Sequence, residues 1–119
     1  MKKQLDLVKA FHKKFKVPVL DEPSLIPRDR LNFRHELMKG EVDEYLTGAR
    51  SDNLENIAKE LADVLFAVYG TILEHGLQDK IEDIFEEVYK SNMSKDYHRY
   101  KMVKGPDYFP ADIKKFLNK

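Results

Sequence analysis

Cysteine is absent from this chain of 119 residues. Its absence excludes disulfide bonds, thiolate metal sites and a cysteine nucleophile, and nothing points to an oxidising compartment, so we expect a cytoplasmic protein. A long hydrophobic run is missing as well. The longest nearly uncharged run, Leu61–Leu73, is too short to cross a bilayer, and residues 1–16 alternate apolar and basic side chains. We therefore expect neither a signal segment nor a membrane span.

An excess of charge of either sign is also lacking, because 21 Lys and Arg residues balance 21 Asp and Glu residues. No global electrostatic field would draw the chain to nucleic acid or to an anionic lipid surface, so neither nucleic acid nor a membrane is expected as a partner. A chain of this length can bury about two-thirds of its unfolded surface. We predict a single domain that covers residues 1–119.

Apolar residues recur at intervals of three and four, which predicts helices. One helix should end before residue 17, and others should lie at about 28–51, 54–74 and 81–91. Three prolines keep residues 17–29 out of a helix, and the polar, basic and aromatic segment after Ser91 is expected to be irregular before a short helix at about 111–117. No strand is predicted. The expected fold class is an all-α bundle of four main helices.

The same periodicity predicts which side chains point inward. In the second helix they are Leu31, Met38, Val42, Tyr45 and Ala49. In the third helix they are Leu54, Ile57, Ala58, Leu61, Leu65, Val68 and Ile72. The third helix is apolar nearly all round, and its neighbours would leave part of that surface uncovered. We therefore expect a homodimer or a dimer of dimers.

Two pairs of acidic residues share one spacing, Glu41-x-x-Glu44 and Glu60-x-x-Asp63. Positions i and i+3 lie on one helix face, about 4.5 Å apart along the axis, so each pair presents two carboxylates in one direction. If the two helices pack together, four carboxylates converge, and cations must neutralise them. Oxygen ligands favour Mg²⁺ or Mn²⁺. Because a single Glu-x-x-Glu is common on solvated helices, the spacing alone leaves a metal site and an exposed acidic face both open.

These motifs and their neighbours resemble the MazG-like, phosphoribosyl-ATP-pyrophosphohydrolase-like branch of the all-α nucleoside triphosphate pyrophosphohydrolases. The stretches that carry the resemblance are VKAFHKKFKVPV, RHELMKGEVDEYLTGA, AKELADVLFAVYGTILEHG, EEVYKSNMSK and KGPDYFP, which together cover nearly the whole chain. The resemblance implies that Glu41, Glu44, Glu60 and Asp63 bind Mg²⁺. It also implies hydrolysis of a nucleoside triphosphate, such as dUTP or dCTP, to the monophosphate and pyrophosphate.

The resemblance further implies that the C-terminal third contributes to the nucleotide site. Asn92 continues the inward stripe of the fourth helix, where an amide needs a hydrogen-bond partner, and Lys95 follows three residues later. In the tail, Lys104 and Tyr108 are the corresponding candidates for substrate contacts. The basic and aromatic segment 95–104 could alternatively bind a short single strand of nucleic acid, but its length favours a triphosphate clamp. The four histidines show no ligand spacing, so we expect them at the surface or at helix ends.

One position departs from the family pattern. Members often carry a glutamate directly before the first metal-binding glutamate, assigned as the base that orients the attacking water, and here that residue is Gly40. Glu36 and Asp43 lie on the same helix face as Gly40 and are the candidate catalytic residues. Two other functions stay open. One is hydrolysis of phosphoribosyl-ATP, and the other is a catalytically weakened helical module that binds a nucleotide or a protein.

Overall fold

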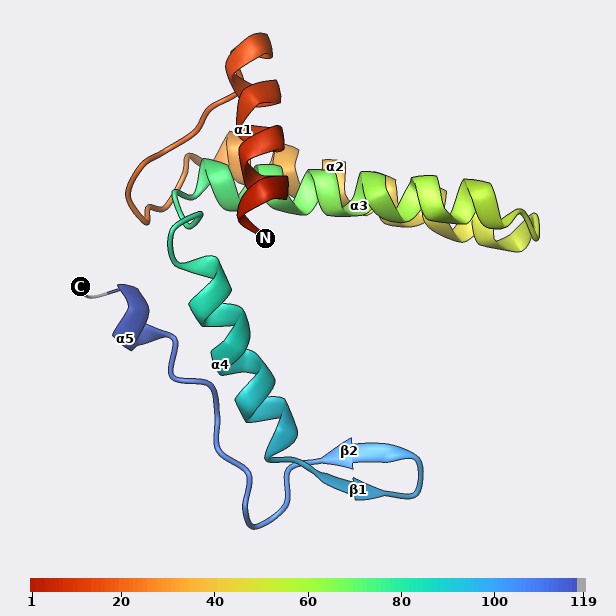
Figure 1. Cartoon of the computed structure of the whole chain (residues 1–119), viewed down its shortest axis with the longest axis vertical. Coiled ribbons are helices and arrows are strands. Elements are labelled where there is room, and N and C mark those ends of the chain that lie inside the picture. Colours follow the sequence, from red (N-terminus) through yellow and green to blue (C-terminus); the bar gives the residue numbers. More distant parts are fainter. Residues whose placement is uncertain (118–119) are drawn as a thin grey trace. The chain divides into compact units, whose positions relative to one another are not determined.

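The computed structural model describes residues 1–117, which divide into two compact units, Met1–Gln78 and a second unit that begins at Asp79 (Figure 1). The first unit contains α1 (Lys2–Phe15), α2 (Arg28–Arg50) and α3 (Leu54–Glu74). The second contains α4 (Ile81–Met93), strands β1 (Asp96–His98) and β2 (Lys101–Val103), and the short helix α5 (Lys114–Leu117). The predicted all-α class is confirmed. The single domain over residues 1–119 stays a prediction, and each unit is described by itself.

Helices α2 and α3 form an antiparallel hairpin (Figure 1). The tight turn between them contains Asp52 in the left-handed region, with φ of 56°, and Asn53, whose side chain accepts a 3.1 Å hydrogen bond from the Asn56 N–H and so caps α3. Gly48 allows the helices to approach closely, because a Cβ atom there would lie 2.6 Å from the Asn56 Nδ2 atom. Sequence positions equally distant from the turn therefore lie opposite each other on the two helices.

Helix α1 packs on the C-terminal half of α3. Leu5 and Val8 are buried, and the Phe11 ring meets the Phe66 ring edge to face, with 5.0 Å between the ring centroids. The helix ends at Phe15 and is capped by Lys16, which adopts the left-handed conformation with φ of 58° and donates its N–H to the carbonyl oxygen of His12. The chain then leaves α1 toward the proline-containing loop.

This loop is tied to the end of α3. The Leu20 N–H donates to the Leu73 carbonyl oxygen at 3.0 Å, and the Ser24 N–H donates to the His75 carbonyl oxygen at 2.9 Å. Gly76 has a φ of +67°, and a Cβ atom there would collide with the Glu22 backbone, so this close approach requires glycine. The loop thereby returns the chain to the position at which α2 begins.

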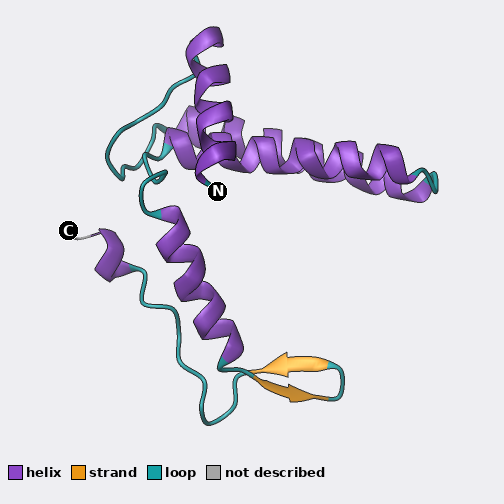
Figure 2. Cartoon of the chain, viewed as in Figure 1, coloured by secondary structure: helices purple, strands orange, loops and turns teal. Residues whose placement is uncertain are grey.

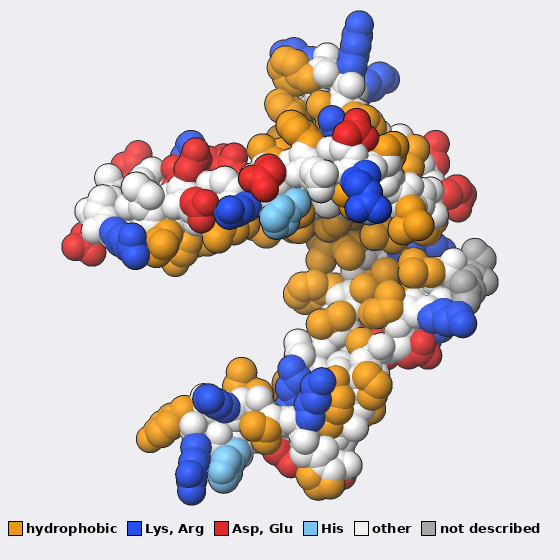
Figure 3. All heavy atoms as spheres, turned by 180° about the vertical axis from the view of Figure 1, so that it is seen from behind, with side chains coloured by type: hydrophobic (Ala, Val, Ile, Leu, Met, Phe, Trp, Pro, Cys, Tyr) orange, Lys and Arg blue, Asp and Glu red, His pale blue; other side chains and the backbone are white. Residues whose placement is uncertain are grey.

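The inward faces predicted for α2 and α3 are wrong in part. Within the single chain Leu54 is 78 % exposed and Leu65 is 51 % exposed, and Leu31, Val42 and Leu61 are also exposed. The reason is that the faces between the helices hold charged and small side chains, among them Arg34, Gly48 and Glu60. The apolar side chains consequently turn outward. Figure 3 shows them along one edge of the α2–α3 hairpin, opposite an edge that carries acidic side chains.

The second unit contains a two-stranded antiparallel hairpin that the sequence did not predict (Figure 2). Tyr97 pairs with Met102, and the two-residue turn consists of Arg99 and Tyr100, with φ of 47° and 70°. A turn with both central residues in the left-handed region usually carries Asn-Gly or a similar pair. Because Arg-Tyr gives no such signal, the segment looked irregular.

The segment that follows β2 in this unit is held to α4 by hydrogen bonds. Ser91 is buried, and its Oγ atom donates a 2.8 Å hydrogen bond to the carbonyl oxygen of Phe109. The Glu87 carboxylate accepts hydrogen bonds from the Asp112 N–H and the Lys115 ammonium, each 3.1 Å long, and these donors lower the pKa of Glu87. Both anchors lie on α4. Between residues 1 and 117 no helix is both long enough and apolar enough to span a membrane.

Candidate active site

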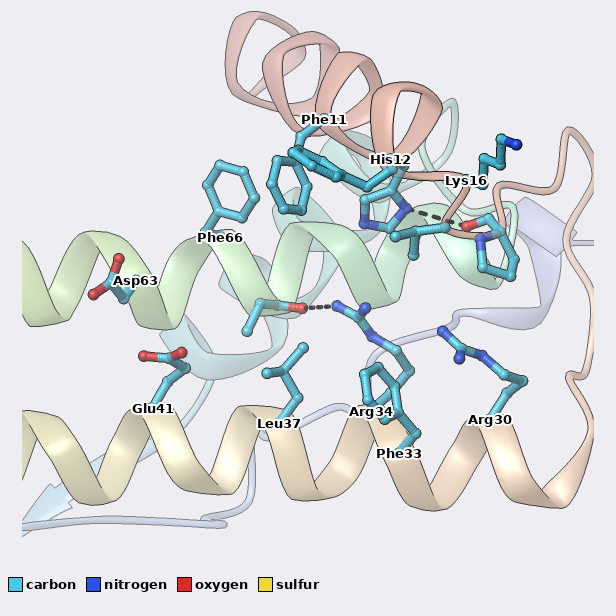
Figure 4. A pocket seen from close by; sticks show the side chains of 14 residues that line it. Phe11, His12, Lys16, Arg30, Phe33, Arg34, Leu37, Glu41, Asp63 and Phe66 are labelled. Atoms are coloured by element: carbon cyan, nitrogen blue, oxygen red, sulfur yellow. Dashed lines mark hydrogen bonds between the residues drawn. The ribbon is translucent and has the colours of Figure 1, made fainter.

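Three of the four predicted metal ligands lie together. Glu41 on α2 and Glu60 and Asp63 on α3 each offer a carboxylate oxygen, and these oxygens all lie within 4.8 Å of one another. The α2–α3 turn explains this arrangement, because Glu41 precedes Ser51 by ten residues and Asp63 follows Asn53 by ten. Figure 4 shows Glu41 and Asp63 facing each other from the two helices.

The fourth predicted ligand, Glu44, is exposed at the edge of this group. Burial raises the pKa of Glu41, and so do the neighbouring carboxylates, Glu44 and Asp63 foremost. A hydrogen bond with Glu44 raises the pKa of Glu41 further, so Glu44 adjoins the triad. We refer to Glu41, Glu44, Glu60 and Asp63 as the acid group.

The carboxylate oxygens of the acid group have few hydrogen-bond donors around them. The Oε2 atoms of Glu41 and Glu60 are buried without a hydrogen-bond partner among residues 1–117. The cation that pairs with this group among the described residues is Lys59, whose Nζ atom lies 2.9 Å from Asp63 Oδ2 and 3.9 Å from Glu60 Oε1, and this side chain is 68 % exposed. One exposed ammonium leaves most of the negative charge uncompensated. Unpaired carboxylate oxygens of this kind fit a hard divalent cation.

A cavity of about 490 Å³ begins at Glu41 and Asp63 and extends between α1, α2 and α3. This volume lies in the range of small-molecule sites. Besides four aliphatic residues, side chains of three kinds line it: aromatic rings, cationic or imidazole groups, and the two carboxylates. They are Phe11, Phe15, Phe33 and Phe66; His12, Lys16, Arg30 and Arg34; and Glu41 and Asp63. Figure 4 shows the carboxylates at one end and the basic side chains at the other.

The basic end is organised around Glu74, which is 1 % exposed. Arg30 donates through Nε and Nη2 to the two oxygens of the Glu74 carboxylate, at 3.0 and 2.8 Å. The Nη1 atom of Arg34 lies 3.1 Å from Glu74 Oε2, while its Nη2 donates to the Ala67 carbonyl oxygen at 2.8 Å and its Nε to Thr71 Oγ1 at 3.0 Å. Arg34 therefore links α2 to α3 along the floor of the cavity.

His12 completes this end. It lies in the last turn of α1, in line with the helix-end alternative of the prediction, but its side chain is 2 % exposed and is therefore not at the surface. Its Nδ1 atom lies 3.1 Å from the Pro18 carbonyl oxygen (Figure 4). Burial is the largest cause that lowers the pKa of His12, and the charges of Arg34 and Arg30 lower it further, against opposing effects of the Pro18 hydrogen bond and Glu74.

Sequence reasoning missed His12, Arg34 and Glu74, although two signals were present. His12 stands four residues after Val8 and seven after Leu5, which places it on the inward stripe of α1. Glu74 follows directly on the nearly uncharged run Leu61–Leu73. No sequence signal paired Arg34 with Glu74, because the two residues lie 40 positions apart and meet only when α2 packs on α3.

The structure does not bring the predicted catalytic residues to the acid group. Glu36 is 71 % exposed beside His35, with 3.6 Å between His35 Nδ1 and Glu36 Oε1, and Asp43 is also exposed. Glu36 lies five residues before Glu41 and Asp43 lies two residues after it, and these separations correspond to about 140° and 160° around the helix axis. The side chains of Glu36 and Asp43 therefore point away from Glu41. Gly40 lies next to Glu41, and a Cβ atom there would meet nothing within 4 Å. The catalytic roles of Glu36 and Asp43 stay predictions.

The predicted substrate-binding residues all belong to the second unit. Asn92 is exposed on α4, so its predicted inward position is wrong, and the adjacent Ser91 is buried instead. Lys95 is half-buried just after α4, and its N–H donates to the Asn92 carbonyl oxygen at 3.2 Å. The Lys104 Nζ atom lies 5.3 Å from the centre of the Tyr108 ring. Their contacts with a substrate stay predictions.

Comparison with known proteins agrees with this geometry. The sequence profile of a family described as phosphoribosyl-ATP pyrophosphohydrolase matches residues 8–92, which include α1 from Val8 onward, all of α2 and α3, and α4 up to Asn92. The match therefore contains the whole acid group and every residue of the basic end. No curated protein sequence matches the chain.

Proposed function

The chain belongs to the phosphoribosyl-ATP pyrophosphohydrolase family, whose members are hydrolases that act on acid anhydrides, and we propose that its substrate is a nucleoside triphosphate. Cleavage between the α and β phosphates would release a nucleoside monophosphate and pyrophosphate. The observation that carries the proposal is the position of the acid group at one end of an aromatic and basic cavity. A triphosphate needs its phosphate charge neutralised, and its base needs a surface to bind. A cation held by the acid group would do the first, and the aromatic and basic end of the cavity offers the second.

We propose Mg²⁺, with Mn²⁺ as a substitute, as the cation of the acid group. Glu41, Glu44, Glu60 and Asp63 would hold it, and their unpaired buried oxygens support this choice. Bound there, the cation would neutralise phosphate oxygens and lower the pKa of a water molecule. The chain's own contribution is to fix the carboxylates on two packed helices. Lys59 supplies an exposed positive charge beside Asp63.

The length of the cavity supports a proposal for the position of the nucleoside. Glu41 and Arg34 are seven residues apart on α2, and Asp63 and Gly70 are seven apart on α3, a span of about 10 Å along each helix. A triphosphate at the acid group would therefore place the sugar between Leu37, Ala67 and the phenylalanine rings, and the base at the basic end. We propose a deoxynucleotide such as dUTP or dCTP for this position.

Residues of the second unit are proposed to hold the triphosphate. Asn92, Lys95, Lys104 and Tyr108 supply an amide, two ammonium groups and a phenol for this purpose. We expect Lys95→Ala to raise KM, or to lower kcat/KM, without shifting the melting temperature, because a partly exposed lysine contributes little to folding. Lys90→Ala is the matched control, since Lys90 lies on α4 and pairs with Glu86 at the surface. Unchanged kinetics in Lys95→Ala would make Lys104 the better candidate.

A second candidate substrate is phosphoribosyl-ATP, which the description of the matching family favours. The two candidates are separated by incubating the purified chain and Mg²⁺ with a panel of NTPs, dNTPs and phosphoribosyl-ATP and identifying each product. Pyrophosphate and a monophosphate from one triphosphate support the first candidate, and turnover of phosphoribosyl-ATP alone supports the second. Release of orthophosphate would contradict both candidates and indicate another hydrolytic reaction. If no member of the panel gives a product, both candidates fail and a binding module is favoured.

We further propose that the active protein is a homodimer, or a dimer of dimers, in the cytoplasm. Leu7 on α1 is 61 % exposed, and with Leu65, Phe66 and Tyr69 of α3 it borders an apolar groove of about 210 Å³. A second copy of the chain would bury this surface. Light scattering at micromolar concentration tests the proposal, and a monomer there would contradict it. Leu65→Glu should shift a dimer toward monomer, whereas Glu55→Gln on the same helix should not.

A further inference from the structure

The hydrogen bond that His12 makes determines which of its ring nitrogens can accept a hydrogen bond from a ligand in the cavity. A carbonyl oxygen only accepts hydrogen bonds, so the 3.1 Å contact between His12 Nδ1 and the Pro18 carbonyl oxygen requires the proton on Nδ1. Burial and the nearby guanidinium groups of Arg34 and Arg30 lower the pKa of His12 and so favour the neutral ring. In that state the second nitrogen, Nε2, is a hydrogen-bond acceptor.

The position of Nε2 depends on Gly70. A Cβ atom at Gly70 would lie 2.8 Å from His12 Nε2 and 2.4 Å from Arg34 Nη2, so any larger residue would displace both groups. Arg34 Nη2 donates to the Ala67 carbonyl oxygen, and among residues 1–117 no donor forms a hydrogen bond with His12 Nε2. The side chain is 2 % exposed and lines the cavity. An acceptor on the wall of a cavity, in a side chain with this little exposure, is available to a ligand that supplies a donor.

We propose that His12 is a specificity-determining residue, whose Nε2 accepts a hydrogen bond from the imide N–H of a uracil or thymine base. The inference rests on the proposed function, because the triphosphate must lie at the acid group for the base to reach His12. Glu41 and Arg34 lie about 10 Å apart along α2. One nucleotide can therefore place its phosphates at the acid group and its base at the basic end. The Phe11 and Phe66 rings offer apolar surface to a flat base.

The charges around His12 distinguish uracil from cytosine. A uracil edge presents its N3–H between two carbonyl oxygens, so the N–H can face Nε2 while the oxygens face cationic groups. Arg30, Arg34 and Lys16 line this end of the cavity and supply that environment. Cytosine presents a lone pair at N3, which would oppose the lone pair of Nε2, and an amino group that would face the guanidinium groups. The site thus favours the base with the imide.

The test compares three substrates with the wild-type chain and Mg²⁺: dUTP, dCTP and N3-methyl-dUTP, in which a methyl group replaces the donated hydrogen. We expect kcat/KM to fall by about tenfold or more from dUTP to each of the others, because each leaves a buried acceptor unpaired. Equal kcat/KM for dUTP and dCTP would overturn the inference. So would equal values for dUTP and N3-methyl-dUTP.

The variant His12→Phe tests whether this discrimination belongs to His12. It should reduce the preference for dUTP over N3-methyl-dUTP to about twofold or less, mainly through KM. His75→Phe is the matched control, because His75 also binds a backbone carbonyl through Nδ1, that of Ser24 at 2.9 Å, and does not line the cavity. This control should keep the wild-type preference. A preference that survives in His12→Phe would overturn the inference, and if that variant does not fold, the wild-type comparison still decides.

Failure of the inference is distinguishable from failure of the proposed function. Turnover of triphosphates without dependence on N3–H would reject only the role of His12. If no triphosphate is hydrolysed, the function fails, and calorimetry with α,β-imido-dUTP and α,β-imido-dCTP in the presence of Mg²⁺ measures base selection directly. Tighter binding of the uracil analogue, lost in His12→Phe, would support the inference even then, and equal binding of the two analogues would overturn it.

Discussion

The Arg34 guanidinium lies 3.1 Å from the Glu74 carboxylate, and these two side chains are only 4 % and 1 % exposed. Removal of one partner from a buried ion pair leaves an uncompensated charge and typically costs about 3–5 kcal/mol. Glu74 also accepts two hydrogen bonds from Arg30. We therefore expect Glu74→Gln to lower the free energy of unfolding by about 3 kcal/mol, measured by urea denaturation at pH 7.5.

The control for this prediction is an ion pair at the surface. Glu86→Gln removes the partner of Lys90, where the two side chains are more than half exposed and lie 3.7 Å apart. Pairs of this kind contribute at most about 1 kcal/mol. Equal losses of stability in Glu74→Gln and Glu86→Gln would show that the buried cluster does not hold α2 to α3.

The sequence predicted the helices and the acid group well, because both depend on local spacing. The carboxylates of Glu41, Glu60 and Asp63 needed only two packed helices to converge, whereas Glu44 lies exposed beside them. The basic end was not predictable in this way. Arg34 meets Glu74 only through tertiary packing, and Arg34, on the mixed face of α2, carries no sign of burial in the sequence. The Arg99-Tyr100 turn was missed because its residues lack the usual turn chemistry.

Burial of His12 predicts a dependence of stability on pH. The pKa of His12 is lowered in the folded chain, whereas an unfolded histidine has a pKa of about 6.5. The unfolded chain therefore binds more protons as the pH falls, and stability should decline below about pH 6.5 toward the lower folded-state pKa. Urea denaturation at pH 7.5 and 5.5 measures the decline. His12→Phe should reduce it, and the exposed His98→Gln should not.

The acid group predicts that cations stabilise the chain. Burial raises the pKa of Glu41, and repulsion from the neighbouring carboxylates raises it further, so millimolar Mg²⁺ or Mn²⁺ should raise the melting temperature. Asp63→Asn should abolish that increase and the hydrolysis together, while Glu55→Gln on the first turn of α3 should keep both. Calorimetric scans with and without Mg²⁺ measure the effect. Metal-independent hydrolysis, or wild-type activity in Asp63→Asn, would contradict the assignment of the acid group.

Substitution of Gly40 tests how the attacking water is oriented. A Cβ atom at Gly40 meets nothing within 4 Å, so Gly40→Glu should fold and should gain about 0.5–1 kcal/mol from helix propensity. If the chain lacks a general base, the new carboxylate beside Glu41 should raise kcat tenfold or more, since such a base contributes about 10²–10⁴ in rate. Steady-state kinetics at saturating Mg²⁺ measure the gain.

The competing outcome assigns the base to residues already present. Glu36 and Asp43 lie on the same side of α2 as Gly40, about 40° and 60° from it around the helix axis. If either orients the water, Gly40→Glu should give no gain, and Glu36→Gln or Asp43→Asn should lower kcat sharply while the Mg²⁺-dependent rise in melting temperature persists. If none of the three substitutions changes kcat, the acid group and its cation are sufficient to orient the water, because Glu44, the remaining carboxylate on this side of α2 within one turn of Gly40, itself belongs to the acid group.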